Sequence, residues 1–245
     1  MTDASSLDGG VLAAGEGSRL RRDGYAMPKI MVPVAGVPLI EHVVGNFVAA
    51  GITPIAIVAN QEASDGARSV CTRFPGWDIQ VVTKTTGSSL ESFQELARGA
   101  RAGRTLISTV DAWCPTDDFV RFVEAARHFP GDTTVIAVTP FVADERPLWV
   151  TLDKAGRVTQ LGGASGTVVT AGIYLVPESV RGMSRAHPGG RLRDFLAWLV
   201  ARGGPVYGLS IPAVVDVDRA QDVALAETLA RRLSLDVHVL RSPAS

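Results

Sequence analysis

Near its start the chain carries a short apolar run, Val-Leu-Ala-Ala at residues 11–14, which ends at the turn Gly15-Glu16-Gly17-Ser18. An apolar run of this length, bounded by glycines, is typical of a strand buried in the middle of a parallel sheet. The two glycines of the turn carry no Cβ, so their backbone N–H groups can approach an anion closely. The pattern predicts a strand, then a loop that binds an anion, and then a helix.

Two basic side chains follow this turn, Arg19 at once and Lys29 after Pro28. The planar guanidinium of an arginine can bind two phosphate oxygens, whereas a lysine adds a point charge. Proline restricts the backbone before Lys29 and stiffens the second part of the loop. We therefore expect Arg19 and Lys29 to act on a polyphosphate. The residues expected to bind the nucleotide here are Leu12, Ala13, Ala14, Gly15, Gly17 and Ser18.

Two better-known phosphate loops do not fit these residues. A Walker loop needs a lysine after its second glycine, and although Gly10 and Gly15 have the right spacing, Glu16 occupies the lysine position. A dinucleotide fingerprint needs a third glycine three residues after Gly17, where this chain has Leu20. A dinucleotide-dependent oxidoreductase is thus disfavoured. For the glycines taken alone, an ordinary strand-to-helix turn remains the alternative.

The pattern LAAGEGSRL, followed by Pro28-Lys29 and by Gly-Val-Pro-Leu-Ile at residues 36–40, resembles the signature of a family of nucleotidyltransferases. These enzymes join a nucleoside triphosphate to a phosphorylated sugar, polyol or alcohol and release pyrophosphate. The resemblance continues at lower density to about residue 230. It implies an EC 2.7.7 activity, with a nucleoside triphosphate and a small phosphorylated acceptor as partners. The segments GSSLESF, LGG and VDVD look closer to compact cytidylyltransferases acting on inositol phosphate or similar polyol and alcohol phosphates, which favours CTP and leaves UTP or another triphosphate open.

Apolar strands and helical patterns alternate along the first half of the chain, which predicts a Rossmann-like, three-layer α/β/α fold with a mixed, mostly parallel sheet. The resemblance implies the same fold, of the nucleotide-diphospho-sugar transferase type. We expect one domain over residues 1–245, with a nucleotide-binding half near 8–140 and an acceptor-binding half near 141–235. The expected strands are 9–14, 52–59, 78–83, 104–110, 132–138, 167–177, 205–211 and 213–217, with a hairpin over 148–162 that turns at residues 154–156. The expected helices are 38–50, 62–73, 88–102, 116–128, 191–203 and 218–233.

Composition and charge exclude several other classes. The 245 residues carry a formal net charge of −1, which gives no general reason to expect nucleic acid or an anionic membrane surface as a partner. Cys71 and Cys114 match no metal or redox spacing, as expected for a reduced protein. Neither a signal peptide nor an apolar run of membrane length is evident. We expect a cytoplasmic protein without a membrane partner, and a homo-oligomer remains open.

Three aspartates are candidate ligands for Mg²⁺, the ion that this chemistry needs to offset the charge of the phosphates. Asp111 follows the expected strand 104–110, and ligands of open α/β sheets bind at the carboxyl ends of strands. Asp216 and Asp218 are two residues apart, so their side chains face the same side if the backbone is extended. The resemblance implies a metal ligand in this segment, with Asp218 preferred over Asp216. A turn or a helix cap is the alternative for each aspartate.

A second turn, at Gly87 and Ser88, precedes a helix whose free N–H groups suit an anion or a carbonyl group. The resemblance implies that this turn contacts the nucleobase, so Gly87 and Ser88 are expected to bind the nucleotide. Lys84 lies just before the turn and could reach a phosphate. Equally, Ser88 or Ser89 could be an ordinary helix cap completed by Glu91.

The resemblance also implies that Thr170 and Gly172 contact the acceptor. Family members that act on sugars often carry Glu-Lys-Pro after the preceding hairpin, where the lysine binds the acceptor phosphate. Residues 160–166 of this chain, QLGGASG, contain no lysine. Either another cation replaces it or the acceptor is not a common hexose phosphate, and a nucleotide-binding regulatory module without turnover remains the alternative function. The candidate replacements are Lys84, Arg146, Arg157 and Arg185.

Overall fold

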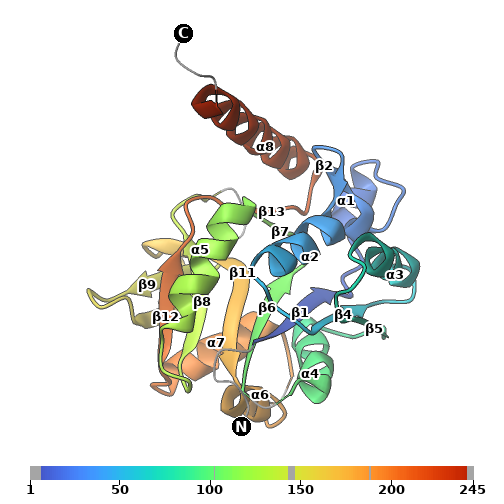
Figure 1. The fold of residues 1–245 in the computed structure, drawn as a ribbon. Helices are drawn as coiled ribbons and strands as arrows, with labels where there is room; N and C mark the ends of the chain where they lie inside the picture. The colour runs from blue at the N-terminus through green and yellow to red at the C-terminus, as the bar shows by residue number, and fades with distance from the viewer. Residues whose placement is uncertain (1–6, 102, 143–146, 188, 242–245) are drawn as a thin grey trace.

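The computed structural model describes residues 7–101, 103–142, 147–187 and 189–241, with side chains up to residue 232. A mixed β-sheet lies between two layers of helices, and the last helix extends away from the body of the molecule (Figure 1). The predicted three-layer α/β fold is confirmed. It places the carboxyl ends of several parallel strands at one edge of the sheet, where ligands of such folds bind.

The first half of the chain supplies the parallel part of the sheet. In sheet order its strands are β5 (Ile79–Thr83), β4 (Ile55–Ala59), β1 (Asp8–Ala13) and β6 (Arg104–Thr109). β1 lies in the middle, parallel to both β4 and β6. Its apolar side chains are buried on both faces of the sheet, because Val11 packs in one hydrophobic cluster and Leu12 in the other. Burial on both faces explains why the run is apolar without alternation.

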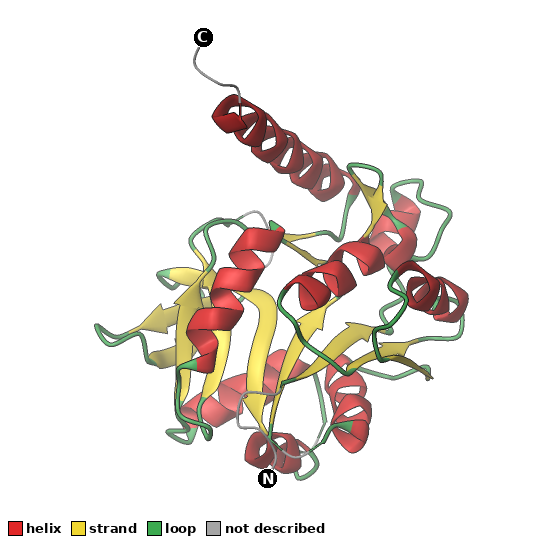
Figure 2. Ribbon diagram, in the orientation of Figure 1, coloured by secondary structure: helices red, strands yellow, loops and turns green. Residues whose placement is uncertain are grey.

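Helices cover the two faces of the sheet separately (Figure 2). One layer contains α2 (Leu39–Ala49), α3 (Ser64–Arg73) and α5 (Thr116–Arg127). The other layer contains α4 (Ser89–Gly99), α6 (Glu178–Ser184) and α7 (Leu192–Ala201). Phe47 of α2 and Phe119 of α5 are fully buried on the first face, whereas Phe93 of α4 and Phe195 of α7 are buried on the second.

The second half of the chain extends the same sheet. Its strands are β8 (Thr134–Thr139), β9 (Trp149–Leu152), β10 (Val158–Leu161), β11 (Val168–Pro177) and β12 (Val206–Ser210). β11 runs antiparallel to β6, β8 and β9, whereas β12 is parallel to β8. The register between β11 and β8 shifts between Thr170 and Tyr174, and Gly172 within that segment has a φ of +71°. Glycine tolerates this conformation, so the strand can bend there.

Several short elements, which the sequence did not predict at these bounds, surround the edge of the sheet. They are α1 (Ser18–Arg22), the 3-10 helix η1 (Lys29–Met31), β2 (Pro33–Val34), β3 (Val37–Pro38), β7 (Ala112–Trp113) and β13 (Val215–Asp216). β7 and β13 pair as a separate two-stranded sheet, with Asp216 opposite Ala112. The last helix, α8 (Ala220–Arg241), follows directly. This small sheet brings the end of the chain next to the residues that follow β6.

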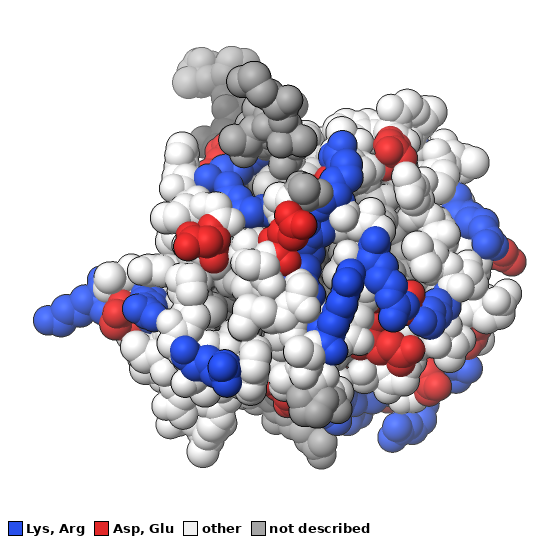
Figure 3. All heavy atoms as spheres, turned by 90° about the horizontal axis from the view of Figure 1, so that it is seen from below, with Lys and Arg blue, Asp and Glu red and all other residues white. Residues whose placement is uncertain are grey.

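Basic and acidic side chains are interspersed on the face drawn in Figure 3. Within the described ranges, no helix is both long and apolar enough to cross a bilayer.

Candidate functional site

Three aspartates converge at the edge of the sheet, and we call Asp111, Asp216 and Asp218 the aspartate triad. Asp111 follows β6, Asp216 ends β13, and Asp218 lies just before α8. One carboxylate oxygen of each lies within 4.8 Å of the others. The backbone N–H of Val217 donates to the carbonyl oxygen of Asp111 at 3.0 Å, which holds the two segments together. Three hard oxygen donors at this separation suit Mg²⁺.

Lys29 is buried against the triad, with only 6% of its side chain exposed. Its Nζ donates to Asp111 Oδ2 at 2.5 Å and also contacts Asp218 Oδ1. Burial alone would lower the pKa of Lys29, but the charges of Asp111, Asp218 and Asp216 outweigh it and raise that pKa above its usual value. Burial opposes ionisation of Asp111, yet Lys29 holds the pKa of this carboxyl below its usual range. Lys29 and Asp111 are therefore both charged at neutral pH.

Arg19 reaches the same carboxylates from the predicted anion loop. Its Nη1 lies 2.8 Å from Asp218 Oδ2, in a pair whose side chains are 41% and 31% exposed. Such an open pair contributes little stability, so the guanidinium is available to a ligand. Gly17, with a φ of +63°, lets Lys29 pack closely against the anion loop, because a Cβ at position 17 would lie 2.7 Å from the Cβ of Lys29.

The start of α8 is held by acidic side chains other than Asp218. Asp222 Oδ2 accepts hydrogen bonds from the backbone N–H groups of Asp218 at 3.0 Å and Arg219 at 2.8 Å. Asp23 Oδ2 accepts one from the N–H of Ala220, also at 3.0 Å. The capping role considered for Asp218 is thus filled by Asp222 and Asp23, and the carboxylate of Asp218 faces Lys29 and Arg19 instead.

A cavity of about 650 Å³ lies beside the anion loop, and we call it the loop cavity. Ala14 and Ser18 line it, whereas the other predicted residues of this loop do not. Asn60 fixes one wall, because its Nδ2 donates to Ala14 O at 3.1 Å while its Oδ1 accepts from Ala63 N at 2.8 Å. Leu12 and Ala13 are buried in β1 beneath this region. Residues that line the loop cavity without having been predicted include Arg21, Arg22, Asn60, Gln61, Glu62, Thr85 and Thr86.

The turn before α4 is a helix cap in the structure. Ser88 Oγ accepts from the backbone N–H of Glu91 at 3.2 Å, and Glu91 Oε2 accepts from that of Gly87 at 2.7 Å. Lys84 Nζ contacts Glu95 and lies 3.9 Å from Glu91 Oε1. Gly87, Ser88 and Lys84 do not line the loop cavity, nor the second cavity of the site. The capping alternative weighed from the sequence is what the geometry shows.

A second cavity, of about 270 Å³, lies on the other side of the site, and we call it the aspartate cavity. The triad lines it together with Thr170 and Gly172, the two predicted acceptor contacts. The lining also includes Tyr174 and Arg193, which sequence reasoning missed. Lys29 and Arg19 contact the triad but line neither of the two cavities.

Of the cations suggested as replacements for the missing lysine, those that the structure describes do not line the aspartate cavity. Arg157 Nη2 donates to Gly203 O at 2.8 Å, and Arg185 ends α6, so neither lines the cavity. Arg146 lies outside the described residues. Arg193 carried no distinguishing signal in the sequence, because a charged residue in the amphipathic segment 191–203 is expected to be solvated.

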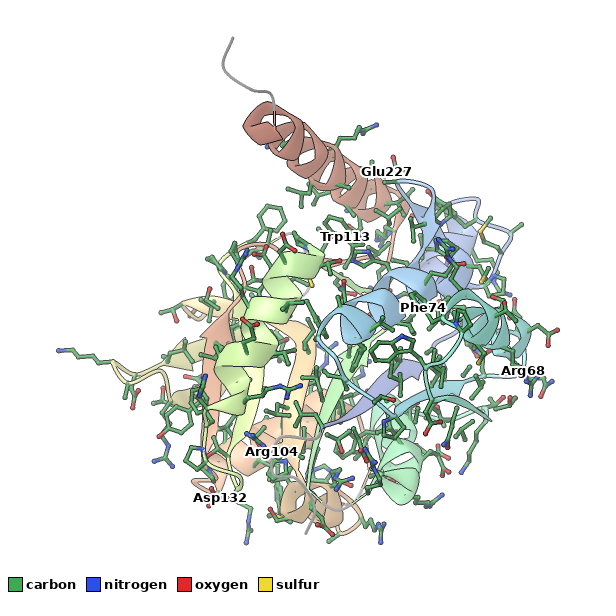
Figure 4. The ribbon with its side chains drawn as sticks, viewed as in Figure 1. Arg68, Phe74, Arg104, Trp113, Asp132 and Glu227 are labelled. Atoms are coloured by element: carbon green, nitrogen blue, oxygen red, sulfur yellow. The ribbon has the colours of Figure 1, made fainter. Side chains whose placement is uncertain are left out.

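The core beneath the triad is aromatic. Trp113 is 4% exposed and lies beneath α8 in Figure 4. Its ring stacks on that of His42, with centroids 5.4 Å apart, and His42 Nε2 forms a hydrogen bond of 2.7 Å with Cys114 O. Burial lowers the pKa of His42, so this imidazole is neutral at physiological pH. Trp113 therefore packs in the core beside the site.

Comparisons with known proteins agree with this geometry. A family model described as a MobA-like NTP transferase domain matches residues 9–197. Over 91% of its length the chain is 27% identical to the bifunctional protein GlmU of Kineococcus radiotolerans. Over 52% of its length it is 29% identical to the CMP-5'-(3-aminopropyl)phosphonate synthase of Streptomyces rubellomurinus. The chain covers 49% of the first protein and 16% of the second, so it spans about half or less of these relatives.

Solved structures share the fold. The inositol-1-phosphate CTP transferase from T. maritima superposes with a TM-score of 0.80 over 92% of this chain and 96% of that one. The sequence identity is 17%, so this likeness concerns the fold alone.

Proposed function

Because the chain belongs to the family of MobA-like NTP transferase domains, we propose that it transfers a nucleotidyl group from a nucleoside triphosphate to a phosphorylated small molecule. The acceptor is a sugar, polyol or alcohol that carries a phosphate, and pyrophosphate is the second product. CTP is the preferred donor, a choice that rests on the sequence resemblance to compact cytidylyltransferases. The names of two similar proteins, a CTP transferase and a CMP-phosphonate synthase, support the same choice.

One observation carries the proposal: two cations from the anion loop meet three carboxylates from distant segments. Lys29 and Arg19 come from the first thirty residues, whereas Asp111 and Asp218 follow strands far along the chain. A site of this kind binds several phosphates and the cation that accompanies them. Burying charges costs free energy, and binding a nucleotide without catalysis would not require the buried charges of Lys29 and Asp111.

The reaction needs no general base. An oxygen of the acceptor phosphate, already anionic, attacks the α-phosphorus of the triphosphate, and the bond from that phosphorus to the bridging α–β oxygen breaks. The electron pair of this bond leaves with pyrophosphate. Lys29 and Arg19 donate hydrogen bonds to the triphosphate oxygens as negative charge grows on the leaving group. Positioning and charge neutralisation therefore account for catalysis.

The aspartate triad is proposed to hold Mg²⁺. When bound, this ion neutralises phosphate charge and aligns the phosphates. Lys29 and Arg19 pair with the same carboxylates, so they keep the triad compact until a ligand arrives. Asp222 accepts a hydrogen bond from the backbone N–H of Asp218. This bond fixes the backbone there, so the carboxylate of Asp218 stays directed toward Lys29.

The two cavities separate donor from acceptor in this proposal. The nucleoside triphosphate occupies the loop cavity, with its phosphates against residues 14–19 and Lys29. Thr85 and Thr86 line that cavity, and they lie between Lys84 and Gly87 in the chain. We therefore keep Lys84, Gly87 and Ser88 as proposed nucleotide contacts, although they do not line the cavity themselves. The acceptor occupies the aspartate cavity, which Thr170 and Gly172 line together with the triad.

Pyrophosphate release tests the proposal. ATP, CTP, GTP and UTP are each incubated with Mg²⁺ and a panel that contains glucose 1-phosphate, inositol 1-phosphate, glycerol 3-phosphate and an aminoalkylphosphonate. We expect one pair to release pyrophosphate and to lose that activity when EDTA removes the metal. Binding of a nucleotide without pyrophosphate release from any pair would favour the regulatory module instead.

A further inference from the structure

The aspartate cavity presents an electrostatic problem to any phosphorylated acceptor. Three carboxylates line it, and among the described residues of its lining Arg193 is the only basic one. Lys29 and Arg19 reach the triad from the side of the anion loop and are not part of this lining. Lys29 and Arg19 offset two of the three negative charges of the triad, but a phosphate or phosphonate dianion that enters the cavity still needs a cationic hydrogen-bond donor among the residues that line it.

Arg193 is held in place by its backbone and not by its side chain. It is the second residue of α7, and the N–H of the preceding Leu192 donates to Ser89 Oγ at 3.0 Å. Leu192 is 4% exposed, so the start of α7 is anchored against α4. The side chain of Arg193 is exposed to the cavity and forms no hydrogen bond or ion pair with any described residue.

The position of Arg193 brings no evident gain in stability. A cation in the first turn lies near the positive end of the helix dipole, where acidic side chains are preferred. Neighbouring Asp194 meets that preference, because its carboxylate accepts from the backbone N–H of Arg191 at 2.9 Å. Arginine at position 193 is therefore better explained by a ligand than by the helix.

Tyr174 places a neutral donor in the same cavity. Burial raises the pKa of its hydroxyl, and the nearby carboxylates of Asp216 and Asp111 raise it further, against the opposing charge of Arg193. The hydroxyl thus stays protonated at neutral pH, and it forms a hydrogen bond with Thr170, another residue of the cavity lining. A guanidinium and a phenol close enough to interact electrostatically form a suitable pair for a tetrahedral anion.

We propose that Arg193 binds the phosphate or phosphonate group of the acceptor and replaces the lysine that residues 160–166 lack. The inference rests on the proposed function, and it identifies the residue that gives the acceptor site its preference for a dianion. A guanidinium can bind two oxygens of such a group at once, whereas lysine offers a single point charge. The other candidate cations in the described chain, Lys84, Arg157 and Arg185, lie outside this cavity.

Steady-state kinetics with the productive donor and acceptor test this assignment. Arg193→Gln is expected to raise KM for the acceptor about tenfold or more while KM for the triphosphate stays within about twofold. Arg193→Lys should recover part of the loss, since it restores the charge without the planar fork. Arg157→Gln, which removes an arginine from outside the cavity, is the matched control. An unchanged acceptor KM in Arg193→Gln would overturn the assignment and leave the proposed function standing.

A binding measurement covers the case in which no pair of substrates reacts. The protein labelled with ¹⁵N-arginine is titrated with inorganic phosphate, and the Nε signal absent from Arg193→Gln identifies the side chain. We expect the chemical shift of this signal to change on addition of phosphate and to stay unchanged on addition of chloride at equal ionic strength. If no pair of substrates releases pyrophosphate, the proposed transferase activity is contradicted. If the chemical shift of Arg193 does not change with phosphate, the proposed anion site is contradicted.

Discussion

Arg19 Nη1 lies 2.8 Å from Asp218 Oδ2, although 199 positions separate the two residues in the chain. The contact joins the first loop of the fold to the segment that precedes its last helix. Lys29 makes a second such connection to Asp218, at a separation of 189 positions. The site is therefore complete only when the end of the chain has folded back onto the edge of the sheet.

Asp111→Asn should abolish pyrophosphate release and leave the fold intact. The amide keeps the shape of the side chain but removes the charge that faces Lys29 and a bound cation. We expect a loss of at least about a hundredfold in kcat, with thermal unfolding close to that of the parent protein. Asp132→Asn, at an exposed aspartate far from Trp113 in Figure 4, is the control and should retain full activity. An active Asp111→Asn enzyme would show that this carboxylate has no part in catalysis.

Gly17→Ala should destabilise the protein, whereas Gly15→Ala in the same turn should not. An alanine at position 17 must adopt a φ of +63° and brings its Cβ to 2.7 Å from the Cβ of Lys29. This strain costs about 1–3 kcal/mol. A Cβ at position 15 meets nothing within 4 Å. Urea denaturation measures the difference, and equal midpoints for the two variants would contradict it.

Arg104→Met should lower the free energy of unfolding without changing KM for either substrate. The Arg104 guanidinium donates to the carbonyl oxygens of Ala126, Arg127 and Phe129, and so satisfies the C-terminal end of α5. The loss of these charged hydrogen bonds costs about 1–3 kcal/mol.

Arg68→Met provides the comparison for that measurement. Arg68 is also labelled in Figure 4, but its side chain is 58% exposed and its ion pair with Asp65 spans 3.5 Å. Exposed pairs of this kind contribute less than about 1 kcal/mol. Chemical denaturation should therefore separate the two arginine variants, and an Arg104→Met protein as stable as Arg68→Met would refute the capping role.

Cys114 should resist alkylation in the folded protein. Burial raises the pKa of this thiol to about 12, with a further contribution from Asp118. Only the thiolate reacts, and its fraction at about pH 8 is then very small and rises only as the pH approaches that value. Cys71 is partly exposed. Mass spectrometry after treatment with iodoacetamide should show one adduct on the native protein and two after unfolding in guanidinium, and two native adducts would contradict the burial of Cys114.

The long elements could be predicted because a long helix repeats its apolar residues with the helical period, and a buried strand is an apolar run between turn residues. The helix expected at 116–128 is α5 at Thr116–Arg127, and the apolar run at 11–14 leads to β1 and its loop as expected. The strand expected at 52–59 begins later, at Ile55, because Pro54 cannot donate to the ladder. The strand expected at 213–217 is reduced to β13 at Val215–Asp216, and its partner β7, two residues long, has no period to detect and exists only through tertiary pairing.

The site was predictable where a residue type followed a recognisable strand or turn. Asp111, Asp216 and Asp218 were chosen in this way, and the structure brings them together. Arg193 gave no such signal, since its importance depends on which cavity the first turn of α7 faces. The role of Asp222 in holding the backbone of Asp218 likewise depends on a local hydrogen bond that spacing alone did not specify.

The bend in β11 at Gly172 has a consequence for the shape of the aspartate cavity. After the bend β11 pairs with β6, the strand that Asp111 follows, whereas before the bend it pairs with β9. Residues from both parts line the aspartate cavity, with Thr170 before the bend and Tyr174 after it. Any other residue at position 172 would have to adopt the positive φ of this bend and would bring its Cβ to 2.6 Å from Thr109 Oγ1, so the shape of the cavity depends on a position that carries no side chain.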